Sequence, residues 1–411
     1  MVLSFSLRAT DAVVRSPRTL PPRLATFLWC FTLALLFVAG FVRPVAADVL
    51  GDVTESEIRT AKPGALIRLW PLLGGAPEGA RAYRVLYRST GLNDEPIAVS
   101  GAIIFPDGPA PAQGRDVVAW AHPTTGVAEQ CAPTRLPDLS GNIAGLDEML
   151  EHGYVVAATD YPGLGSMGTH PYLIGVTEAH AVLDSVRAAR ELPDAKARDR
   201  FVVWGHSQGG HAALFTGELA ASYAPELKLM GVAAAAPATY LAELFDADQS
   251  SIAGKTLAAM AIWSWSTTYN VPYDGIVAPQ AHTSFEKLAH DCIQSVSELL
   301  KIEQEKSIKR VFLSGDPTKV QPWKSLMEHN SPGHLPPGIP VFLAQGTADT
   351  VVRPAITRRF GEELCKSGAR VKFLEIKNGG HSFAAFHSAH AAVTWMADRF
   401  AGIPAPSDCR N

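Results

Sequence analysis

The 411-residue sequence has no dense block of charge and no basic stripe. Setting aside residues 1–47 removes five Arg and one Asp, which leaves 31 basic and 39 acidic residues and a net charge of −8. Proteins that bind nucleic acid present clustered cations, so this balance argues against a nucleic-acid partner. Internal repeats, low-complexity segments and charged tails are also absent, which predicts a globular chain with a large core.

Cysteine is scarce, and no two of the five cysteines form a Cys-x-x-Cys pair. The sequence therefore gives no support to a zinc knuckle, and no His-Glu-x-x-His motif points to a catalytic metal. One cysteine, Cys30, lies in an apolar N-terminal segment. The other four cysteines are an even number, which in a protein outside the cytosol predicts two disulfides with three possible pairings. The four cysteines concerned are Cys131, Cys292, Cys365 and Cys409.

The N-terminus has the layout of an export signal. Four arginines precede the charge-free apolar run 24–42, and small residues at 44–47 come before Asp48. This order predicts a secretory signal peptide over residues 1–47, and hence a secreted or cell-envelope protein. The apolar run is also long enough to span a bilayer, so an uncleaved membrane anchor is the alternative.

Strand and helix patterns alternate along most of the remaining chain. Residues 81–89 and 96–106 read as an antiparallel strand pair. Apolar strands that alternate with helices then predict a mostly parallel sheet covered by helices on both faces. The predicted strands are 116–122, 154–160, 201–204, 229–236, 339–344 and 371–376, and the predicted helices are 143–153, 177–192, 212–220, 355–367 and 383–400.

The alternation stops between residues 237 and 334, where the pattern predicts helices 241–245, 252–265 and 285–308 without strands. The second of these helices is apolar on more than one face, which fits either a core helix or a cap that lines an apolar tunnel. We therefore predict an α/β core over 48–236 and 335–402, a helical cap over 237–334 and a tail over 403–411.

One short motif carries the predicted chemistry. Gly205-His206-Ser207-Gln208-Gly209 matches Gly-x-Ser-x-Gly, with a four-residue apolar strand before it and a helix after it. Strand, tight turn and helix together are typical of a nucleophile elbow, which projects a strained serine above the sheet. Glycines two positions to either side avoid clashes with the neighbouring strand and helix. Ser207 is thus the predicted nucleophile, and a glycine-rich turn with an idle serine is the alternative.

A serine hydroxyl needs a base, and the base needs an acid to orient it. In an α/β-hydrolase layout both follow the serine, on loops after later strands, in the order serine, acid, histidine. Asp349 follows the strand 339–344 and His381 follows the strand 371–376, so we predict these two residues as acid and base. Asp316, inside the insertion, and Asp160, before the serine, are rival acids in less suitable positions.

An ester intermediate also needs backbone N–H donors at its oxyanion. The N–H of Gln208, directly after the nucleophile, is the first candidate. The second comes from the loop 122–126, where Pro123 has no N–H to give, so we predict Thr124, with Thr125 as an alternative and a mere turn as another. His387 and His390 follow His381 on a helix, and we expect them to be solvated or at the edge of the core rather than to bind a metal.

Several motifs together make residues 63–402 resemble the secretory lipases of the LIP type, the lipase A-like α/β-hydrolases. The stretches that carry the resemblance are 120–126, 130–133, 159–165, 205–210, 345–349 and 380–381. The resemblance implies an α/β-hydrolase fold with a helical cap inserted after the elbow, and a Ser207-Asp349-His381 triad without a cofactor. It also implies a Cys131–Cys292 disulfide, which leaves Cys365–Cys409.

The expected function is therefore a secreted serine hydrolase of triacylglycerols and simpler acyl esters. The expected partner is a small-molecule or lipid ester at a lipid–water interface, with no obligate protein partner evident. An acyltransferase or a serine peptidase of the same fold is an alternative activity. A non-catalytic binding module or membrane-anchored scaffold is a third hypothesis, against which the complete Ser-Asp-His order argues.

Overall fold

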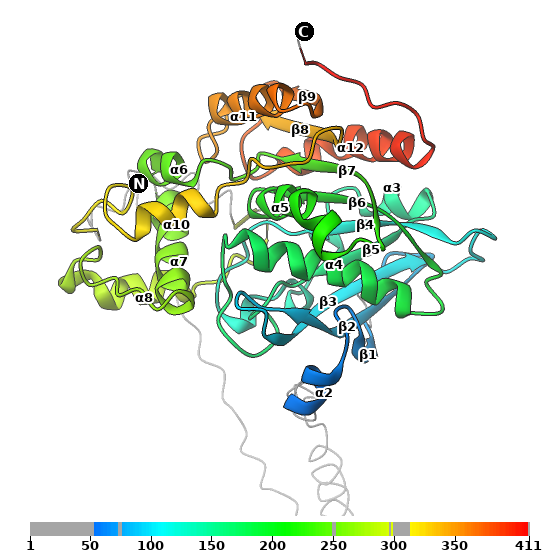
Figure 1. Cartoon of the computed structure of the whole chain (residues 1–411), viewed down its shortest axis with the longest axis horizontal. Coiled ribbons are helices and arrows are strands. Elements are labelled where there is room, and N and C mark those ends of the chain that lie inside the picture. Colours follow the sequence, from blue (N-terminus) through cyan, green and yellow to red (C-terminus); the bar gives the residue numbers. More distant parts are fainter. Residues whose placement is uncertain (1–52, 73–75, 249–251, 296, 299–312, 410–411) are drawn as a thin grey trace, which may run out of the picture. The chain divides into compact units, whose positions relative to one another are not determined.

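Nine strands form one mixed sheet in the order β1-β2-β3-β5-β4-β6-β7-β8-β9 (Figure 1). The computed structural model describes residues 53–72, 76–248, 252–295, 297–298 and 313–409, so the predicted signal peptide lies outside it. The first three neighbouring pairs are antiparallel and the other five are parallel. The strands are β1 Leu66–Pro71, β2 Ala80–Thr90, β3 Pro96–Pro106, β4 Arg115–Ala121, β5 Val155–Thr159, β6 Ala197–His206, β7 Lys228–Ala235, β8 Pro340–Gly346 and β9 Arg370–Ile376.

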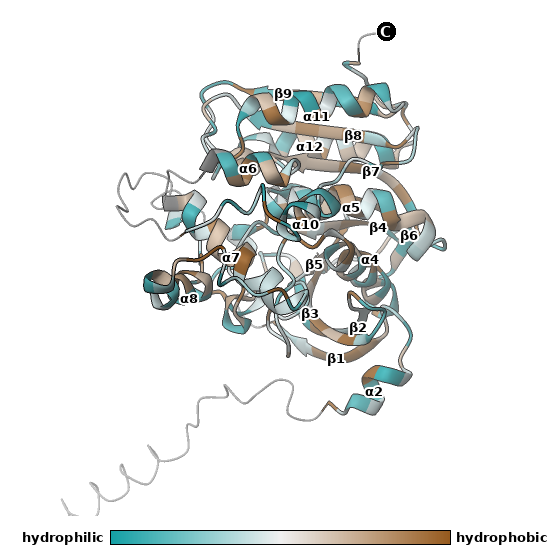
Figure 2. Ribbon diagram, turned by 60° about the vertical axis from the view of Figure 1, so that its left-hand side comes forward, coloured by the Kyte–Doolittle hydropathy of each residue, from teal (hydrophilic) through white to brown (hydrophobic). Residues whose placement is uncertain are grey.

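The central strands are apolar on both faces because both faces are covered. In β6, Phe201 and Val203 pack into one core, and Val202 and Trp204 pack into the other. Figure 2 shows the same composition as hydrophobic colour along β7 and β8, with hydrophilic colour on the outer turns of α8 and α11. This near-continuous apolar run distinguishes buried parallel strands from half-exposed ones.

Helices cover the sheet in two layers. The helices α4 Gly175–Glu191, α5 Gln208–Tyr223 and α11 Pro354–Lys366 pack on one face, and α3 Leu146–Glu151 and α12 Ala384–Phe400 pack on the other. A short helix, α2 Glu55–Thr60, precedes β1. Three 3₁₀ turns, η1 Glu129–Cys131, η2 Pro133–Arg135 and η3 Ser140–Asn142, lie between β4 and α3. The structure thus has the α/β-hydrolase architecture that the sequence predicts.

Between β7 and β8 the described elements are helical: α6 Leu241–Asp248, α7 Ile252–Thr268, η4 Pro279–Ala281, α8 His282–His290 and α10 Trp323–His329. An isolated bridge joins Val277 to Leu313. We call the insertion 237–334 the cap, and Figure 1 shows its helices grouped beside the sheet. The helix α7 has Met260, Ile262 and Trp265 fully buried, which agrees with its apolar pattern on several faces.

One predicted cap helix, 285–308, is confirmed over 285–290 but wrong at 291–295. The helix α8 ends at His290, and residues 291–295 are not helical. Two tertiary contacts hold this segment in a non-helical path. Cys292 forms a disulfide with Cys131, and the N–H of Ile293 donates to the carbonyl of Thr125 at 2.8 Å. Most of the remaining predicted helix, 299–308, lies outside the described residues.

The other differences concern short elements. The predicted helix 143–153 begins only at Leu146, because Gly145 before it has a left-handed backbone with φ 83°. The sequence patterns gave no signal for α2, β1 or α10, which are only six or seven residues long. Among the described helices, none combines the length and hydropathy needed to cross a bilayer.

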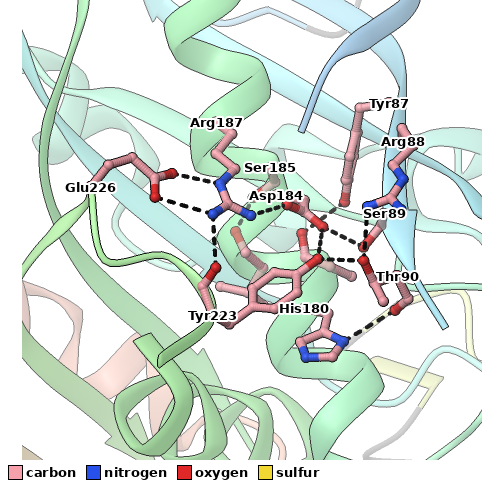
Figure 3. Close-up of polar contacts among 12 residues, drawn as sticks. Tyr87, Arg88, Ser89, Thr90, His180, Asp184, Ser185, Arg187, Tyr223 and Glu226 are labelled. Carbon is pink, nitrogen blue, oxygen red and sulfur yellow. Dashed lines mark hydrogen bonds and ion pairs between the residues drawn. The ribbon is translucent and has the colours of Figure 1, made fainter. Parts of the chain in front are cut away.

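A buried polar cluster fastens the end of β2 to α4 and α5 (Figure 3). Its centre is Asp184, which is 0% exposed and accepts hydrogen bonds from Arg187 at 2.8 Å and from Ser89 and Tyr223 at 2.7 Å. Arg187 continues to Glu226 at 2.7 Å. Both oxygens of the Asp184 carboxylate are thus satisfied, as burial requires.

Candidate active site

Ser207 stands in the turn between β6 and α5 with φ 57° and ψ −116°. A non-glycine residue in this region is strained, as expected for a nucleophile elbow. The two flanking glycines are needed for space. A Cβ on Gly205 would lie 2.0 Å from the carbonyl oxygen of Gly209, and a Cβ on Gly209 would lie 1.8 Å from that of Ala121. The end of β4 therefore packs directly against the elbow.

Three predicted residues from distant parts of the chain form one hydrogen-bonded row. Nε2 of His381 lies 2.8 Å from Oγ of Ser207, and Nδ1 of His381 lies 2.9 Å from Oδ2 of Asp349. All three side chains are buried. Because the Nδ1 proton is directed to the carboxylate, Nε2 has its lone pair free to accept the serine proton.

The carboxylate of Asp349 is held by further donors. The N–H groups of Val351 and Val352 donate to Oδ1 at 2.9 and 2.8 Å, and Nε2 of Gln345 donates to Oδ2 at 2.9 Å. Gln345 is itself fixed by the Thr357 hydroxyl, which donates to it at 2.6 Å. Sequence reasoning assigned Gln345 no role, because its contact with Asp349 depends on how the loop after β8 folds.

The two rival acids form hydrogen bonds or ion pairs with residues other than His381. Asp160 accepts from the Ser100 hydroxyl at 2.6 Å and from the N–H of Thr134 at 2.9 Å. Asp316 accepts from Thr318 and Lys319 within the cap. His387 and His390 are exposed, and His390 contacts Glu148. The described residues contain no group of three or more His, Cys, Asp or Glu placed to hold a metal.

His206, at the first variable position of the Gly-x-Ser-x-Gly motif, contacts His381 directly. Its Nε2 donates to the backbone carbonyl of His381 at 3.0 Å, and the two rings lie 5.0 Å apart. Burial, with the neighbouring His381 as a smaller cause, lowers the pKa of His206 to about 3. A neutral imidazole thus supports the His381 backbone, a role that the motif alone did not suggest.

The two predicted oxyanion donors are Gln208 and Thr124. Gln208 is the first residue of α5, so its N–H has no acceptor within the helix. Thr124 follows β4, and its Oγ1 lies 2.8 Å from the hydroxyl of Tyr172. Tyr172 in turn lines a pocket together with Ser207 and Gln208. The alternative donor, Thr125, has a buried hydroxyl with no partner among the described residues.

Two pockets are lined by residues of this site or their neighbours in the chain. The first, which we call the cap pocket, is lined by Ser207 and mostly by apolar side chains of α6, α7 and the loop after Asp349; these include Leu241, Leu244, Phe245, Leu257, Ala258, Val351 and Val352. The second, the loop pocket, lies on the side of His206 and Ser382. Its other walls include Thr124, Thr125, Pro133, Leu139, Ile143 and Ile293.

Two disulfides brace this arrangement, with the pairing that the resemblance implied. Cys131 is joined to Cys292, which ties the loop after β4 to the cap. Cys365 is joined to Cys409, which ties the C-terminal tail to α11. Disulfides are characteristic of proteins outside the reducing cytosol.

Comparison with known proteins agrees with this geometry. A family model described as "Secretory lipase" matches residues 141–408. The chain belongs to the secretory lipase family. Members of this family are carboxylic ester hydrolases, so the chain is an enzyme of the lipase and esterase class. The family and the two disulfides both point to a location outside the cytosol.

Individual relatives of this secretory lipase are distant but nearly full-length. Lipase A of Arthroderma benhamiae is 25% identical, over 91% of this chain and 85% of its own. A secreted triacylglycerol lipase of Malassezia globosa is 26% identical, over 86% and 76% of the two chains. Among solved structures, Candida antarctica lipase A in its closed state superposes with a TM-score of 0.71 at 17% identity, covering 86% of each chain. The esterase LipA of Xanthomonas oryzae superposes with a TM-score of 0.68 at 22% identity, covering 82% of this chain and 98% of that one. These two structures establish the fold.

Proposed function

We propose that this secretory lipase cleaves acyl esters through a covalent acyl-enzyme, with Ser207 as nucleophile, His381 as base and Asp349 as orienting acid. The supporting observation is the continuous row of hydrogen bonds from Asp349 through His381 to Ser207, at the wall of an apolar pocket. Such a row is the arrangement that activates a weak hydroxyl nucleophile at neutral pH.

The chemical steps follow from the positions of these atoms. Oγ of Ser207 bonds to the ester carbonyl carbon while Nε2 of His381 takes the hydroxyl proton. The backbone N–H groups of Gln208 and Thr124 stabilise the negative oxygen of the tetrahedral intermediate. His381 then gives its proton to the alcohol oxygen as the C–O bond breaks. Water repeats the sequence on the acyl-enzyme and releases the acid. Throughout, Asp349 remains a carboxylate and holds the imidazole in one tautomer.

The two pockets suggest how the substrate lies. The cap pocket borders Ser207 and is lined by aliphatic side chains and Phe245, so it suits the acyl chain. The loop pocket lies beside Ser382 and His206, on the side of the histidine that protonates the leaving group, so it suits the alcohol. This division assigns the cap, residues 237–334, a direct part in substrate binding.

Triacylglycerols are the proposed substrates, as the name of the Malassezia relative suggests. The apolar lining of the cap pocket favours medium or long acyl chains. The residues 1–47 are proposed to direct export and to be removed. An apolar acyl pocket beneath a cap suits a substrate that is presented at a lipid–water interface.

The decisive test is the Ser207→Ala variant of the mature chain with p-nitrophenyl esters of increasing acyl length. We expect turnover to fall by several orders of magnitude, about 10³-fold or more, while the protein remains folded. Fluorophosphonate should label the parent protein and not the variant. Retained turnover by Ser207→Ala would refute the proposal. Product analysis with an added alcohol would distinguish hydrolysis from acyl transfer.

A further inference from the structure

Beneath the nucleophile elbow lies a second polar cluster that the proposed mechanism does not use. It consists of Glu178 on α4, Gln208 and His211 on α5, His170 in the loop after β5 and Asn330 at the end of α10. Each of these residues is at most 1% exposed. Buried polar groups are costly unless they are fully paired, so a cluster of this size at an active site calls for a complete account of its hydrogen bonds.

The bonds of His211 define its charge. Its Nδ1 lies 2.7 Å from a carboxylate oxygen of Glu178, and its Nε2 lies 2.7 Å from the backbone carbonyl oxygen of Asn330. Both partners can only accept when Glu178 is ionised, so both ring nitrogens must donate. With Glu178 ionised, His211 carries both ring protons and the two residues form a fully buried ion pair.

The other oxygen of Glu178 fixes the residue that follows the nucleophile. It accepts from Nε2 of Gln208 at 2.8 Å and from the N–H of Leu173 at 3.1 Å. The second amide proton of Gln208 is directed to Nε2 of His170, 3.0 Å away.

His170 can accept that proton because it is neutral. Its Nδ1 donates to the carbonyl of Pro162 at 2.9 Å, which leaves Nε2 as an acceptor. Burial lowers the pKa of His170 to about 4, in agreement with this tautomer. This orientation directs both amide protons of Gln208 to acceptors and leaves its Oε1 buried without a partner among the described residues. An inverted amide would place that oxygen against the carboxylate of Glu178, which is less favourable.

The same cluster reaches the cap. Asn330, whose carbonyl accepts from His211, also uses its side chain: Oδ1 accepts from the N–H of Gly175 at 3.3 Å, and Nδ2 donates to the hydroxyl of Tyr269 at 2.9 Å. Gly175 begins α4, and Tyr269 directly follows α7. The ion pair therefore joins the start of the nucleophile helix to the end of the cap.

We infer that Glu178 and His211 are positioning residues. Their buried ion pair holds Gln208, and with it the backbone N–H proposed to bind the oxyanion, in the reactive position. The same pair fastens the end of the cap, at Asn330, to the start of α5. The inference rests on the proposed function. An apolar pair of similar volume would avoid the desolvation cost, so a stabilising role alone does not account for an ion pair here. A rigid amide next to the nucleophile, in contrast, serves transition-state stabilisation directly.

The test is the isosteric substitution Glu178→Gln. We expect kcat to fall about tenfold or more while KM changes less than about twofold, because the oxyanion forms only in the transition state. The affinity for a trifluoromethyl ketone, whose adduct carries the oxyanion, should fall in proportion to kcat/KM. Fluorophosphonate should still label Ser207, which separates failure of this inference from failure of the proposed function.

A matched control lies on the same helix. Asp184 is also a fully buried, ion-paired carboxylate of α4, but its partners Arg187, Tyr223 and Ser89 lie in the separate cluster of Figure 3. Asp184→Asn should lower thermal stability and leave kcat and the ketone affinity unchanged. If Glu178→Gln behaves like this control, with lower stability and an unchanged kcat, the positioning role is refuted.

Two further measurements complete the test. Gln208→Ala removes the held side chain without leaving an unpaired charge, so it should lower kcat by a similar factor even if Glu178→Gln does not fold. The double variant Glu178→Gln/Gln208→Ala should then have the same kcat as Gln208→Ala alone, as expected for residues that act as one unit. Nitrogen NMR of His211 in the folded enzyme should detect protons on both ring nitrogens, and a single proton would overturn the ion pair.

Discussion

Oδ2 of Asp349 lies 2.9 Å from Nδ1 of His381, although 32 residues separate them in the chain. The carboxylate has three other donors, from Val351, Val352 and Gln345, so it cannot rotate away from the imidazole without breaking them. The tautomer of His381 is thus set by a carboxylate that is itself held on every side.

Replacing the acid should expose this dependence. In Asp349→Asn the amide would present N–H to Nδ1 of His381, so the ring would carry its proton on Nε2 and could no longer accept from Ser207. We expect kcat for p-nitrophenyl esters to fall by about 10⁴-fold with little change in KM. Gln345→Ala, which removes one supporting donor, should have a smaller effect on kcat in the same assay. A kcat within tenfold of the parent for Asp349→Asn would contradict the assigned role.

The elbow should tolerate no side chain at Gly209. A Cβ there would lie 1.8 Å from the carbonyl oxygen of Ala121, which belongs to a central strand and cannot move aside. Gly209→Ala should therefore destabilise the protein by about 3 kcal/mol or more, measured by urea denaturation, and abolish activity. In Gly333→Ala the new Cβ would meet no atom within 4 Å, so this control should stay within about 0.5 kcal/mol of the parent. Equal stability of the two variants would show that the elbow is less tightly packed than the structure indicates.

The two pockets should control different halves of the ester. Leu257 lines the cap pocket and Leu139 lines the loop pocket. Leu257→Trp should shift the preferred acyl length to shorter chains without changing the ranking of alcohols. Leu139→Trp should lower kcat/KM for esters of bulky alcohols, by about tenfold or more, and leave the acyl-length profile unchanged. The measurement is kcat/KM over a matrix of acyl lengths and alcohols. If Leu139→Trp alters the acyl profile instead, the assignment of the two pockets is reversed.

Stability should fall in mild acid because two buried histidines resist protonation. Burial lowers the pKa of His170 to about 4 and that of His206 to about 3. The unfolded chain binds these protons near pH 6.5, so it holds more protons than the folded state below that pH. The free energy of unfolding should therefore decrease by about 1.4 kcal/mol per pH unit for each histidine as the pH falls from 6.5, until His170 titrates near 4 and His206 near 3.

The contribution of one histidine can be isolated. His206→Gln keeps an N–H donor near the His381 carbonyl but removes the titrating ring. Urea denaturation at pH 6 and pH 4.5 should show a slope reduced by about one proton relative to the parent. An unchanged slope would mean that His206 does not control this pH dependence.

Much of the fold could be predicted from local patterns. The alternation of apolar strands and helices, the antiparallel pair at the start and the helical interruption before β8 all appear in the structure close to their predicted bounds. The elbow could also be predicted from the sequence, because glycine at 205 and 209 and a strand before Ser207 are local requirements of one tight turn. Short elements such as β1 and α10 could not be predicted, since six or seven residues carry too little periodicity.

The sequence by itself determined the chemistry-bearing residue types and their order, because the turn geometry at Ser207 and the loops after β8 and β9 are encoded locally. Only the tertiary structure decided what surrounds them. The helix α8 ends at His290, and Cys292 just beyond it forms a disulfide with Cys131. Glu178 pairs with His211 beside Gln208. Such contacts join residues up to 161 positions apart, and a buried charge finds its partner only once the sheet and the cap have packed around it.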